Sequence, residues 1–421
     1  MKKNNRTIKN VWIFQTGEPV HSDTENTRKM RAINLANKLN ENNYKVTLWT
    51  TDFYHQKKIH RHGSFKKIYF SDNLEIRFIP SPGYKKNISL KRLYDHLVLG
   101  FNLYALLNKE NKVPDIAFIG YPPIETAFIF GRWLKNNNVP FIVDVKDMWP
   151  ELFLKGFPHR IIWLGKLMFF PYFFLSKKVI SYATGISSMT SAMLDRYASK
   201  SGKQKSKFNK VFRLTSERSV GSPEKQSIEW WAKKKVKIDQ PIILFVGSFM
   251  SVFNFTDIQK VAEINPGIQF VLAGDGDYLS EVKKSFEELE NVFFPGWILE
   301  NEVKAISLYA TAFIAPYERI ENFLLNFPNK IVDSLKYGKP IITSLHGEVG
   351  KLIKANNIGF LYEDHKDLNK IIIKLVNDKS LQREMSENAS NLYNREFEFN
   401  SVYGDFVNHL EWVYDNWEKE N

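Results

Sequence analysis

The sequence predicts an α/β protein made of two Rossmann-like domains that face each other across a cleft. Its 421 residues are too many for one ordinary core and suit two domains of about 200 residues each. Strand and helix patterns alternate through the first half, lose their rhythm after residue 200, and restart near residue 241. Such alternation is what parallel sheets with crossover helices require.

The first half opens with a β-α-β unit. Apolar runs at 11–15 and 44–50 flank a segment, 26–43, whose apolar residues recur at near-helical spacing. Further strands are predicted at 74–79, 116–119, 141–145 and 183–187. Helical patterns separate these strands, so we predict that residues 1–200 form an N-terminal Rossmann-like domain.

The second half repeats the rhythm. Residues 201–238 are rich in Lys, Ser and Glu and include Gly221-Ser222-Pro223, so they are predicted to link the domains. A C-terminal Rossmann-like domain is predicted over 239–400, with strands at 241–248, 268–276, 292–297, 312–317 and 339–344. The tail, 401–421, is predicted to be a helix that packs back on the N-terminal domain. Its apolar face contains Val402, Phe406, Leu410, Val413 and Trp417.

The composition excludes several classes of protein. The chain has no cysteine, so disulfides and thiolate chemistry are excluded, and its nine histidines show no metal-ligand spacing. No run reaches the roughly 20 apolar residues that a membrane-spanning helix needs, and the N-terminus lacks a signal-peptide cleavage site. We expect a metal-independent protein in the cytoplasm, soluble or peripheral on the inner face of the plasma membrane.

The net charge is +13, and the cations cluster at 55–67, 84–92 and 200–210. Such clusters attract phosphate groups, for example those of lipid headgroups or lipid diphosphates. A solvated basic surface is the alternative. Nucleic acid is not expected as a partner, because no nucleic-acid-binding module accompanies the charge.

Turns with glycine follow strands in both halves, at Gly17, Gly247 and 274–276. A glycine there lets a ligand approach the backbone, and the next helix offers unpaired N–H groups to a phosphate. Taken alone, a glycine after a strand more often reflects ordinary turn chemistry.

The segment 326–344 is the most informative. Pro328 suits the start of a helix and Gly338 its end, while Lys330 and Asp333 lie three residues apart near the helix start. A cation there can hold a diphosphate, and a carboxylate one turn later can accept both hydroxyls of a ribose. Taken alone, the pair also fits a solvated Lys–Asp contact. We expect both side chains to be solvent-accessible.

This segment and four others resemble the retaining glycosyltransferases of family 4, which have the GT-B fold, in particular the branch that builds bacterial capsule and O-antigen polysaccharides. The resemblance covers nearly the whole chain. Its segments are 17–51, 144–151 (DVKDMWPE), 183–197, 270–282 and 328–344 (PNKIVDSLKYGKPIITS). It implies a nucleotide-sugar donor, with a UDP-sugar favoured and no further cofactor, and a polyprenyl-diphosphate-linked or other glycan acceptor.

The resemblance also implies roles for individual residues. Asp333 would bind the ribose, and the donor diphosphate would lie at Phe327, Asn329, Lys330, Gly17 and Gly247. Trp297 and Ile298 would contact the base. Lys146 and Asp147 would lie beside the reacting sugar, and Glu18, Arg28 and Arg31 on the acceptor side of the N-terminal domain.

The chain departs from the family in three respects. Leu325 stands where many members have a glutamate, and Ser248 and Phe253 stand where an Arg and a Lys often neutralise the diphosphate. The acid at 333 is also Asp instead of the commoner Glu. These departures bear on how the sugar is oriented and how the phosphates are neutralised.

Without a metal motif, N–H groups and the cations Lys330 and Lys146 would have to stabilise the leaving nucleoside diphosphate. Asp147 would orient the acceptor or accept its proton, although in a same-face transfer the departing phosphate can itself be the base. A structural role for Asp147, as the cap of a helix that begins near Trp149, is equally open.

Two further questions stay open at this point. The aromatic-rich segment 161–180, interrupted by Pro171 and flanked by cations, fits either an interfacial helix on anionic lipid or core packing. The alternatives to a transferase are a nucleotide-sugar 2-epimerase of the same fold and a non-catalytic GT-B partner subunit.

Overall fold

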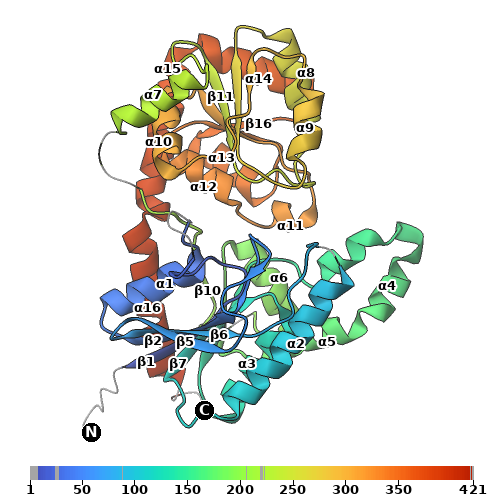
Figure 1. Cartoon of the computed structure of the whole chain (residues 1–421), viewed down its shortest axis with the longest axis vertical. Helices are drawn as coiled ribbons and strands as arrows, with labels where there is room; N and C mark the ends of the chain where they lie inside the picture. Colours follow the sequence, from blue (N-terminus) through green and yellow to red (C-terminus); the bar gives the residue numbers. More distant parts are fainter. Residues whose placement is uncertain are drawn as a thin grey trace. The chain divides into compact units, whose positions relative to one another are not determined.

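The computed structural model describes residues 8–23, 28–87, 89–204, 206–218, 221, 223–417 and 419. Residues 24–27 of the N-terminal motif and Ser222 of the expected linker lie outside this part of the chain. The chain divides into two compact units (Figure 1). Unit 1 contains Met1–Arg213 and Asn400–Asn421, and unit 2 contains Leu214–Phe399.

Unit 1 is built on one twisted sheet. Among the described residues its strand order is β10-β9-β8-β7-β1-β2-β6-β5, parallel throughout except for β5, which is antiparallel to β6. The strands are β1 (Asn10–Phe14), β2 (Lys45–Thr51), β5 (Lys66–Ser71), β6 (Leu74–Ile79), β7 (Ile116–Tyr121), β8 (Phe141–Val145), β9 (Gly185–Ser188) and β10 (Lys210–Val211). The short strands β3 (Phe53–Tyr54) and β4 (Ile59–His60) form a separate antiparallel pair between β2 and β5 in the sequence. The central strands are almost fully buried, because helices cover a parallel sheet on both faces.

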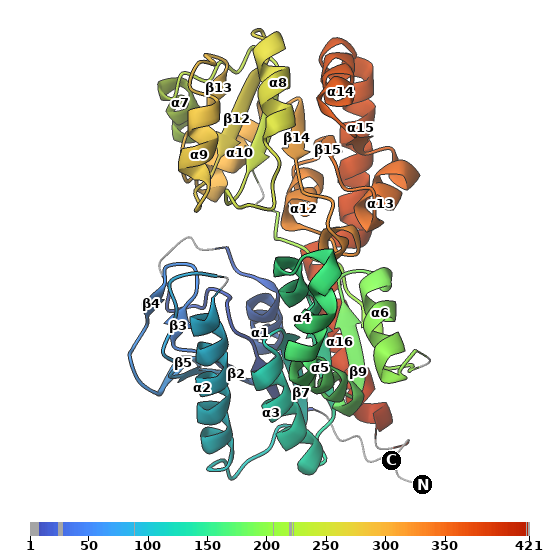
Figure 2. The same ribbon diagram turned by 90° about the vertical axis from the view of Figure 1, so that its right-hand side faces the viewer.

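The helices of unit 1 alternate with these strands. They are α1 (Arg31–Glu41), α2 (Leu90–Leu107), α3 (Ile124–Asn136), α4 (Ile162–Met168), α5 (Phe170–Tyr182), α6 (Ser191–Ser201) and α16 (Phe399–Trp417), with short 3-10 helices η1 (Glu151–Gly156) and η2 (His159–Ile161) before α4. Helix α3 packs between α2 and α5, as Figure 2 shows.

Unit 2 is a second parallel sheet, with strand order β13-β12-β11-β14-β15-β16 in the described structure. Its strands are β11 (Ile242–Val246), β12 (Gln269–Ala273), β13 (Val292–Phe293), β14 (Ala312–Ala315), β15 (Ile341–Thr343) and β16 (Gly359–Leu361). Its helices are α7 (Lys225–Lys233), α8 (Thr256–Ile264), α9 (Leu279–Ser285), α10 (Glu300–Tyr309), α11 (Glu321–Leu324), α12 (Asn329–Lys336), α13 (Glu348–Asn356), α14 (His365–Asn377) and α15 (Lys379–Leu392), which a π-turn, η3 (Tyr393–Phe397), follows.

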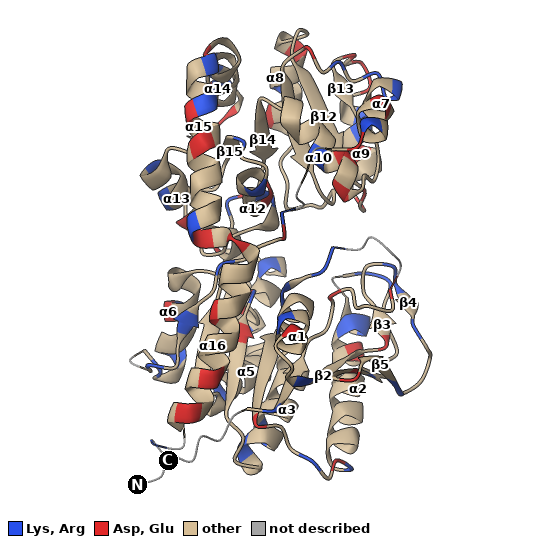
Figure 3. Cartoon of the chain, turned by 90° about the vertical axis from the view of Figure 1, so that its left-hand side faces the viewer, with Lys and Arg blue, Asp and Glu red and all other residues tan. Residues whose placement is uncertain are grey.

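The C-terminal helix α16 packs in unit 1, as the apolar face of the tail predicts. Phe406 is fully buried, stacks on Phe212 with ring centres 3.6 Å apart, and meets Phe118 edge-on at 5.6 Å. His409 contacts the carbonyl oxygen of Phe208 at 3.2 Å. The opposite face carries acidic residues, among them the exposed Asp405, and is visible in Figure 3. The helix therefore completes the core of unit 1.

The segment 201–238, which the sequence predicts to be a linker, contains regular structure. Strand β10 pairs with β9 in unit 1, whereas helix α7 packs against α10 in unit 2. The chain passes from one unit to the other between Arg213 and Leu214.

Candidate functional site

One candidate site lies within unit 2, at the carboxyl end of β11. From β11 the sheet extends to β12 and β13 on one side and to β14, β15 and β16 on the other. In open α/β sheets, ligands bind outside the carboxyl ends of the strands at such a switch point. The turn there contains Gly247, whose amide donates to the carbonyl oxygen of Ala273 at 2.9 Å. The turns after β11 and β12 thus lie side by side.

Lys330 reaches this turn from helix α12. Its ammonium donates a hydrogen bond to the carbonyl oxygen of Val246 at 2.7 Å and lies 4.2 and 4.9 Å from the ring centres of Phe245 and Phe253. Gly247 has a φ of +144°, and a Cβ at this position would lie 1.7 Å from Nζ of Lys330. The glycine therefore makes the room that the ammonium occupies.

The burial of Lys330 differs from the expectation of a solvent-accessible side chain. Only 9% of the residue is exposed. Phe253, one of the two residues that replace the basic pair of the family, is buried and packs on Phe245 and Tyr317, with ring centres 5.4 and 4.6 Å away. Ser248 is exposed. Two aromatic rings thus pack against Lys330 and stabilise its positive charge by cation–π attraction.

The other residues predicted for the donor take different positions. Asp333 and Asn329 are half-buried on α12, and Ile298 is half-buried after β13. Trp297, next to Ile298, is 66% exposed. The amide of Gly274 donates to the carbonyl oxygen of Gly296 at 2.8 Å, so the turn before Trp297 lies beside the turn after β12.

Phe327 does not fit a role in donor binding. It is 1% exposed, and its ring centre lies 5.3 Å from that of Phe397. The aromatic side chain just before a helix start is here an anchor that fixes α12 to the interior of unit 2. The family motif did not distinguish these two roles.

A separate candidate site lies within unit 1, at the carboxyl end of β1, which is the switch point of that sheet. Nζ of Lys146, after β8, donates to Oε1 of Gln15 at 2.7 Å and pairs with the carboxylate of Glu18. A Cβ on Gly120 would lie 1.7 Å from Oε1 of Gln15, so this glycine lets the glutamine cross the end of β7. Gln15 and Gly120 were not predicted as site residues; the signal in the sequence is that Gln15 is a polar residue directly after the apolar run of β1.

Glu18 also accepts hydrogen bonds from the backbone of α1, in addition to its contact with Lys146. Its Oε2 accepts from the amides of Ala32 and Ile33, at 3.0 and 3.4 Å, which are N–H groups of the first turn of α1. The carboxylate is 7% exposed. It therefore caps α1 and positions Lys146, and its predicted place on the acceptor side stays a prediction. Gly17, with φ of +77°, supplies the turn between β1 and this cap.

Arg31 also differs from its predicted role on the acceptor side. It is 3% exposed and forms an ion pair with the buried Asp144, with Nε 2.9 Å from Oδ2. It also donates to the carbonyl oxygen of Phe212 at 3.0 Å. A buried Arg with these partners ties α1 to the sheet. Arg28, three residues earlier, is exposed.

Asp147 lies half-buried in the turn after β8. Its own carbonyl oxygen accepts from the amide of Trp149 at 2.9 Å and from the hydroxyl of Tyr197 at 3.1 Å. The hydroxyls of Tyr121 and Tyr197 both donate to the carbonyl oxygen of Trp149, at 2.8 Å each. Burial raises the pKa of both tyrosines, so they act as neutral donors that hold this turn in place.

Buried titratable groups lie behind the same turn. The ring centre of His96 is 5.7 Å from that of Trp149, and Nδ1 of His96 is 3.7 Å from Oε2 of Glu125. Burial lowers the pKa of His96 to about 3 and raises that of Glu125 to about 7. Neither residue was predicted from the sequence, because the contact joins two helices.

The described residues contain neither a metal-binding cluster nor a membrane-spanning helix. No three His, Asp or Glu side chains in this part of the chain are grouped so that they could hold a metal ion. Among the helices that the structure describes, none is long and apolar enough to cross a membrane.

The class of protein follows from comparisons of this fold and sequence. Residues 227–392, within unit 2, match the model of the family Glycosyl transferases group 1. Solved structures with the same arrangement of two Rossmann-like sheets and a C-terminal helix are GT-B glycosyltransferases, so the chain has the GT-B fold. The family match and the fold together support a GT-B glycosyltransferase. No curated protein sequence shows significant similarity to the chain.

Three solved structures illustrate the likeness. Sucrose-phosphate synthase from Thermosynechococcus elongatus has a TM-score of 0.74 at 13% identity, over 96% of this chain and 99% of that one. HepE from Anabaena, in complex with UDP-glucose, has a TM-score of 0.63 at 13% identity, over 96% and 99%. WaaG, a glycosyltransferase involved in lipopolysaccharide biosynthesis, has 0.64 at 12%, over 95% and 99%. At these identities the likeness concerns the fold.

Proposed function

We propose that the protein is a retaining, metal-independent glycosyltransferase that moves a sugar from a nucleotide-sugar donor to a lipid-linked saccharide acceptor in the synthesis of a bacterial surface polysaccharide. The observation that carries this proposal is the placement of the Lys330 ammonium against Gly247, at the switch point of a unit that matches the group 1 glycosyltransferase model.

Unit 2 is proposed to bind the donor. A diphosphate needs positive charge that is fixed before it arrives. Lys330 supplies a cation that a carbonyl oxygen and two aromatic rings hold at the end of β11. The N-terminus of α12, where Lys330 lies, adds the partial positive charge of unpaired N–H groups. These contributions take the place of the basic pair that Ser248 and Phe253 replace.

Asp333 and Trp297 are proposed to bind the nucleoside. Asp333 lies one turn after Asn329 on α12, and its half-buried carboxylate suits the two hydroxyls of a ribose. Trp297, 66% exposed after β13, offers an aromatic face to a base. UDP is the favoured nucleotide, since HepE, of the same fold, was solved with UDP-glucose.

Unit 1 is proposed to supply the groups that act on the reacting sugar and the acceptor. Glu18 and Gln15 hold the ammonium of Lys146 in one position, where it stabilises negative charge on the departing phosphate. Asp147 orients the acceptor hydroxyl or takes its proton. Retention is supported by the resemblance to family 4, and the acceptor class by that resemblance and by the role of WaaG in lipopolysaccharide biosynthesis.

The test is donor binding and use by the variants Lys330→Ala and Asp333→Ala. Titration calorimetry with UDP and release of UDP from a panel of UDP-sugars measure the two properties. We expect each variant to weaken binding roughly 10-fold to 100-fold, because loss of a charge-assisted contact costs about 1.5 to 3 kcal/mol. Lys354→Ala, which removes an exposed lysine from α13 of the same unit, is the matched control and should bind as the wild type does.

Three outcomes would contradict the proposal. UDP binding that is unchanged in both variants would remove the donor site from α12. Turnover of the donor without any acceptor, to an epimerised sugar nucleotide, would favour the 2-epimerase, and absence of any nucleotide binding would favour a non-catalytic subunit.

A further inference from the structure

A surface pocket of about 420 Å³ lies between α3 and α5 of unit 1, and it includes none of the residues proposed above. It is lined by Phe128, Arg132, Lys135, Asn136, Phe174, Lys178 and Tyr182. The two helices pack side by side (Figure 2), and the ring centres of Phe128 and Tyr182 lie 6.1 Å apart. The floor is thus aromatic and the rim is basic.

The charges of the pocket are of one sign. Arg132, Lys135 and Lys178 line it with no acidic residue. None of the three has a carboxylate within 4.0 Å in the part of the chain that the structure describes. Aromatic faces hold two of them instead: Nζ of Lys135 lies 4.5 Å from the ring centre of Tyr182, and Nζ of Lys178 lies 5.5 Å from that of Phe174. Three cations around one cavity suit a phosphate group.

A fourth cation lies near this group. Burial lowers the pKa of Lys203, and the charge of Lys135 lowers it further. The repulsion that this shift reports is relieved when an anion enters between the cations. The charge around the pocket therefore favours a negative ligand.

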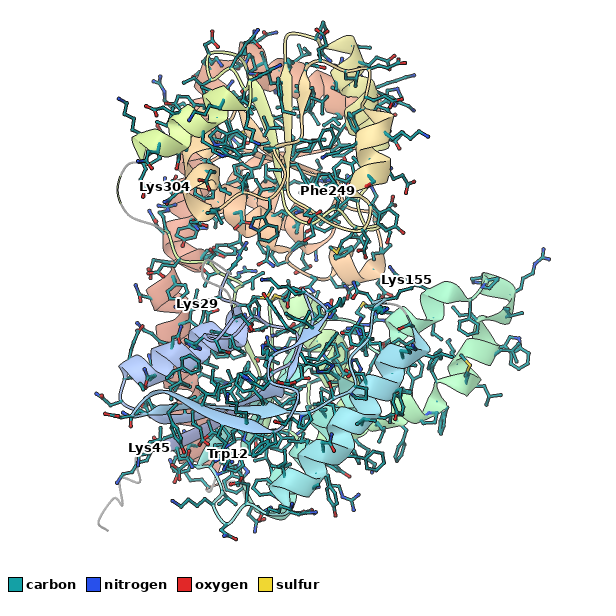
Figure 4. All side chains as sticks on the ribbon, in the orientation of Figure 1. Trp12, Lys29, Lys45, Lys155, Phe249 and Lys304 are labelled. Carbon is teal, nitrogen blue, oxygen red and sulfur yellow. The ribbon has the colours of Figure 1, made fainter. Side chains whose placement is uncertain are left out.

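The helices beside the pocket expose large apolar side chains. On α4 and α5, Trp163 is 60% exposed, Leu167 68%, Phe170 63% and Phe174 50%. Phe174 also lines the pocket, so the apolar surface and the basic rim are continuous. Side chains of α4 and α5 project outward from unit 1 in Figure 4, where Lys155 marks the segment that precedes α4.

The sequence of this region has the same bias. Residues 152–194 contain five Lys and Arg and no Asp or Glu. A free phosphate would pair with the cations and leave the apolar side chains of α4 in water. An apolar protein partner would cover those side chains and leave the cations unmatched. The surface of an anionic bilayer satisfies both, because apolar side chains enter the interface while cations meet headgroup phosphates.

We propose that the pocket between α3 and α5 binds the phosphate of an anionic phospholipid headgroup, while the exposed side chains of α4 and α5 enter the interfacial layer of the membrane. The proposal rests on the proposed function only in that the acceptor there is lipid-linked, and it does not depend on which sugar is transferred. Loss of vesicle binding and loss of donor use are separate measurements, so either proposal can fail alone.

The test is cosedimentation of the full chain with vesicles of phosphatidylcholine, with or without an equal share of phosphatidylglycerol. We expect the wild type to bind only the anionic vesicles. The triple variant Arg132→Ala, Lys135→Ala, Lys178→Ala should bind them roughly 100-fold more weakly, since each cation at a membrane surface contributes about fivefold. Its UDP release should match the wild type, which also shows that it is folded.

The matched control is Lys260→Ala, Lys284→Ala, Lys370→Ala, which removes the same charge from exposed positions of unit 2. This control should keep most of its binding to the anionic vesicles, whereas the double variant Trp163→Ser, Leu167→Ser should lose that binding. If the control lost as much vesicle binding as the pocket variant, the pocket would not be what determines membrane binding. A different result would point to free phosphate as the ligand and overturn the proposal of a lipid headgroup. In that case the wild type would bind inorganic phosphate in calorimetry but would not bind vesicles, and the pocket variant would not bind inorganic phosphate.

Discussion

At the scale of single residues, the contact between Lys330 and Gly247 is the most exacting part of the candidate site. The ammonium occupies the space in which any other residue at 247 would have its Cβ, 1.7 Å away. Neither residue can therefore be understood from its own neighbours in the sequence. The lysine is placed by a glycine that precedes it by more than eighty residues.

We predict that Gly247→Ala reduces UDP binding about as much as Lys330→Ala does, because the new methyl group displaces the ammonium from the end of β11 and the φ of +144° strains any L-residue. Calorimetry with UDP measures this effect. Gly267→Ala is the control, since a Cβ there meets nothing within 4 Å. A Gly247→Ala variant with normal UDP affinity would show that the position of Lys330 is irrelevant to the donor.

The sequence indicated candidate residues for this site but not their environments. The spacing on one helix and the resemblance to family 4 together singled out Lys330 and Asp333, whose roles stay predictions. Burial depends on long-range packing, so the enclosure of Lys330 by Phe245 and Phe253 and the ion pair of Arg31 with Asp144 were not predicted. The same limit explains Glu18. Its role as the cap of α1 depends on a contact with Ala32, 14 residues later in the chain, and a periodic sequence pattern does not predict such a contact.

At the scale of elements, periodicity predicted the strands that are buried on both faces. The expected strands at 74–79 and 141–145 coincide with β6 and β8, because mostly buried strands of a parallel sheet are rich in apolar residues. Strand β5 was not predicted. It is an edge strand with mostly exposed side chains, and its existence depends on pairing with β6 instead of on an apolar pattern. Strand β10, of two residues, is too short to carry a pattern.

Helix α16 was predicted from its apolar face, and its contribution to unit 1 can be measured. We predict that Phe406→Ala destabilises unit 1 by about 3 to 5 kcal/mol, as for other large-to-small changes in a core, because the ring is fully buried between Phe212 and Phe118. Hydrogen exchange in β7 to β10 and thermal unfolding measure the loss. Asn408→Ala, at an exposed position of the same helix, should change little. Faster exchange confined to α16 itself would contradict this account.

At the scale of the whole molecule, the titratable groups of unit 1 give its stability a pH dependence. Burial lowers the pKa of His55 and His409 to about 4 and that of His96 to about 3. Each stays neutral in the fold but binds a proton near pH 6.5 when unfolded. Their contribution is therefore complete above pH 6.5 and is lost as the pH falls toward 4. Glu125, with its raised pKa of about 7, acts oppositely and favours the fold below pH 4.5.

We predict that His409→Gln lowers the melting temperature at pH 7.5, where the neutral histidine packs in unit 1, and that its difference from the wild type narrows at pH 5. The wild type loses on the order of 1 to 2 kcal/mol through this residue over that range. Thermal unfolding at the two pH values measures the difference. His159→Gln, at an exposed position, serves as control, and a gap that stays constant would mean that His409 is not neutral in the fold.

The path of the chain between the two units has a consequence for biosynthesis. Unit 1 ends with Asn400–Asn421, whereas unit 2 is the continuous segment Leu214–Phe399. A ribosome therefore releases all of unit 2 before it releases the helix that carries Phe406 and His409. Because domains fold as they emerge, unit 2 has its whole sequence available first, and unit 1 must wait with the site for α16 uncovered. Synthesis of unit 1 therefore begins before that of unit 2 and ends after it.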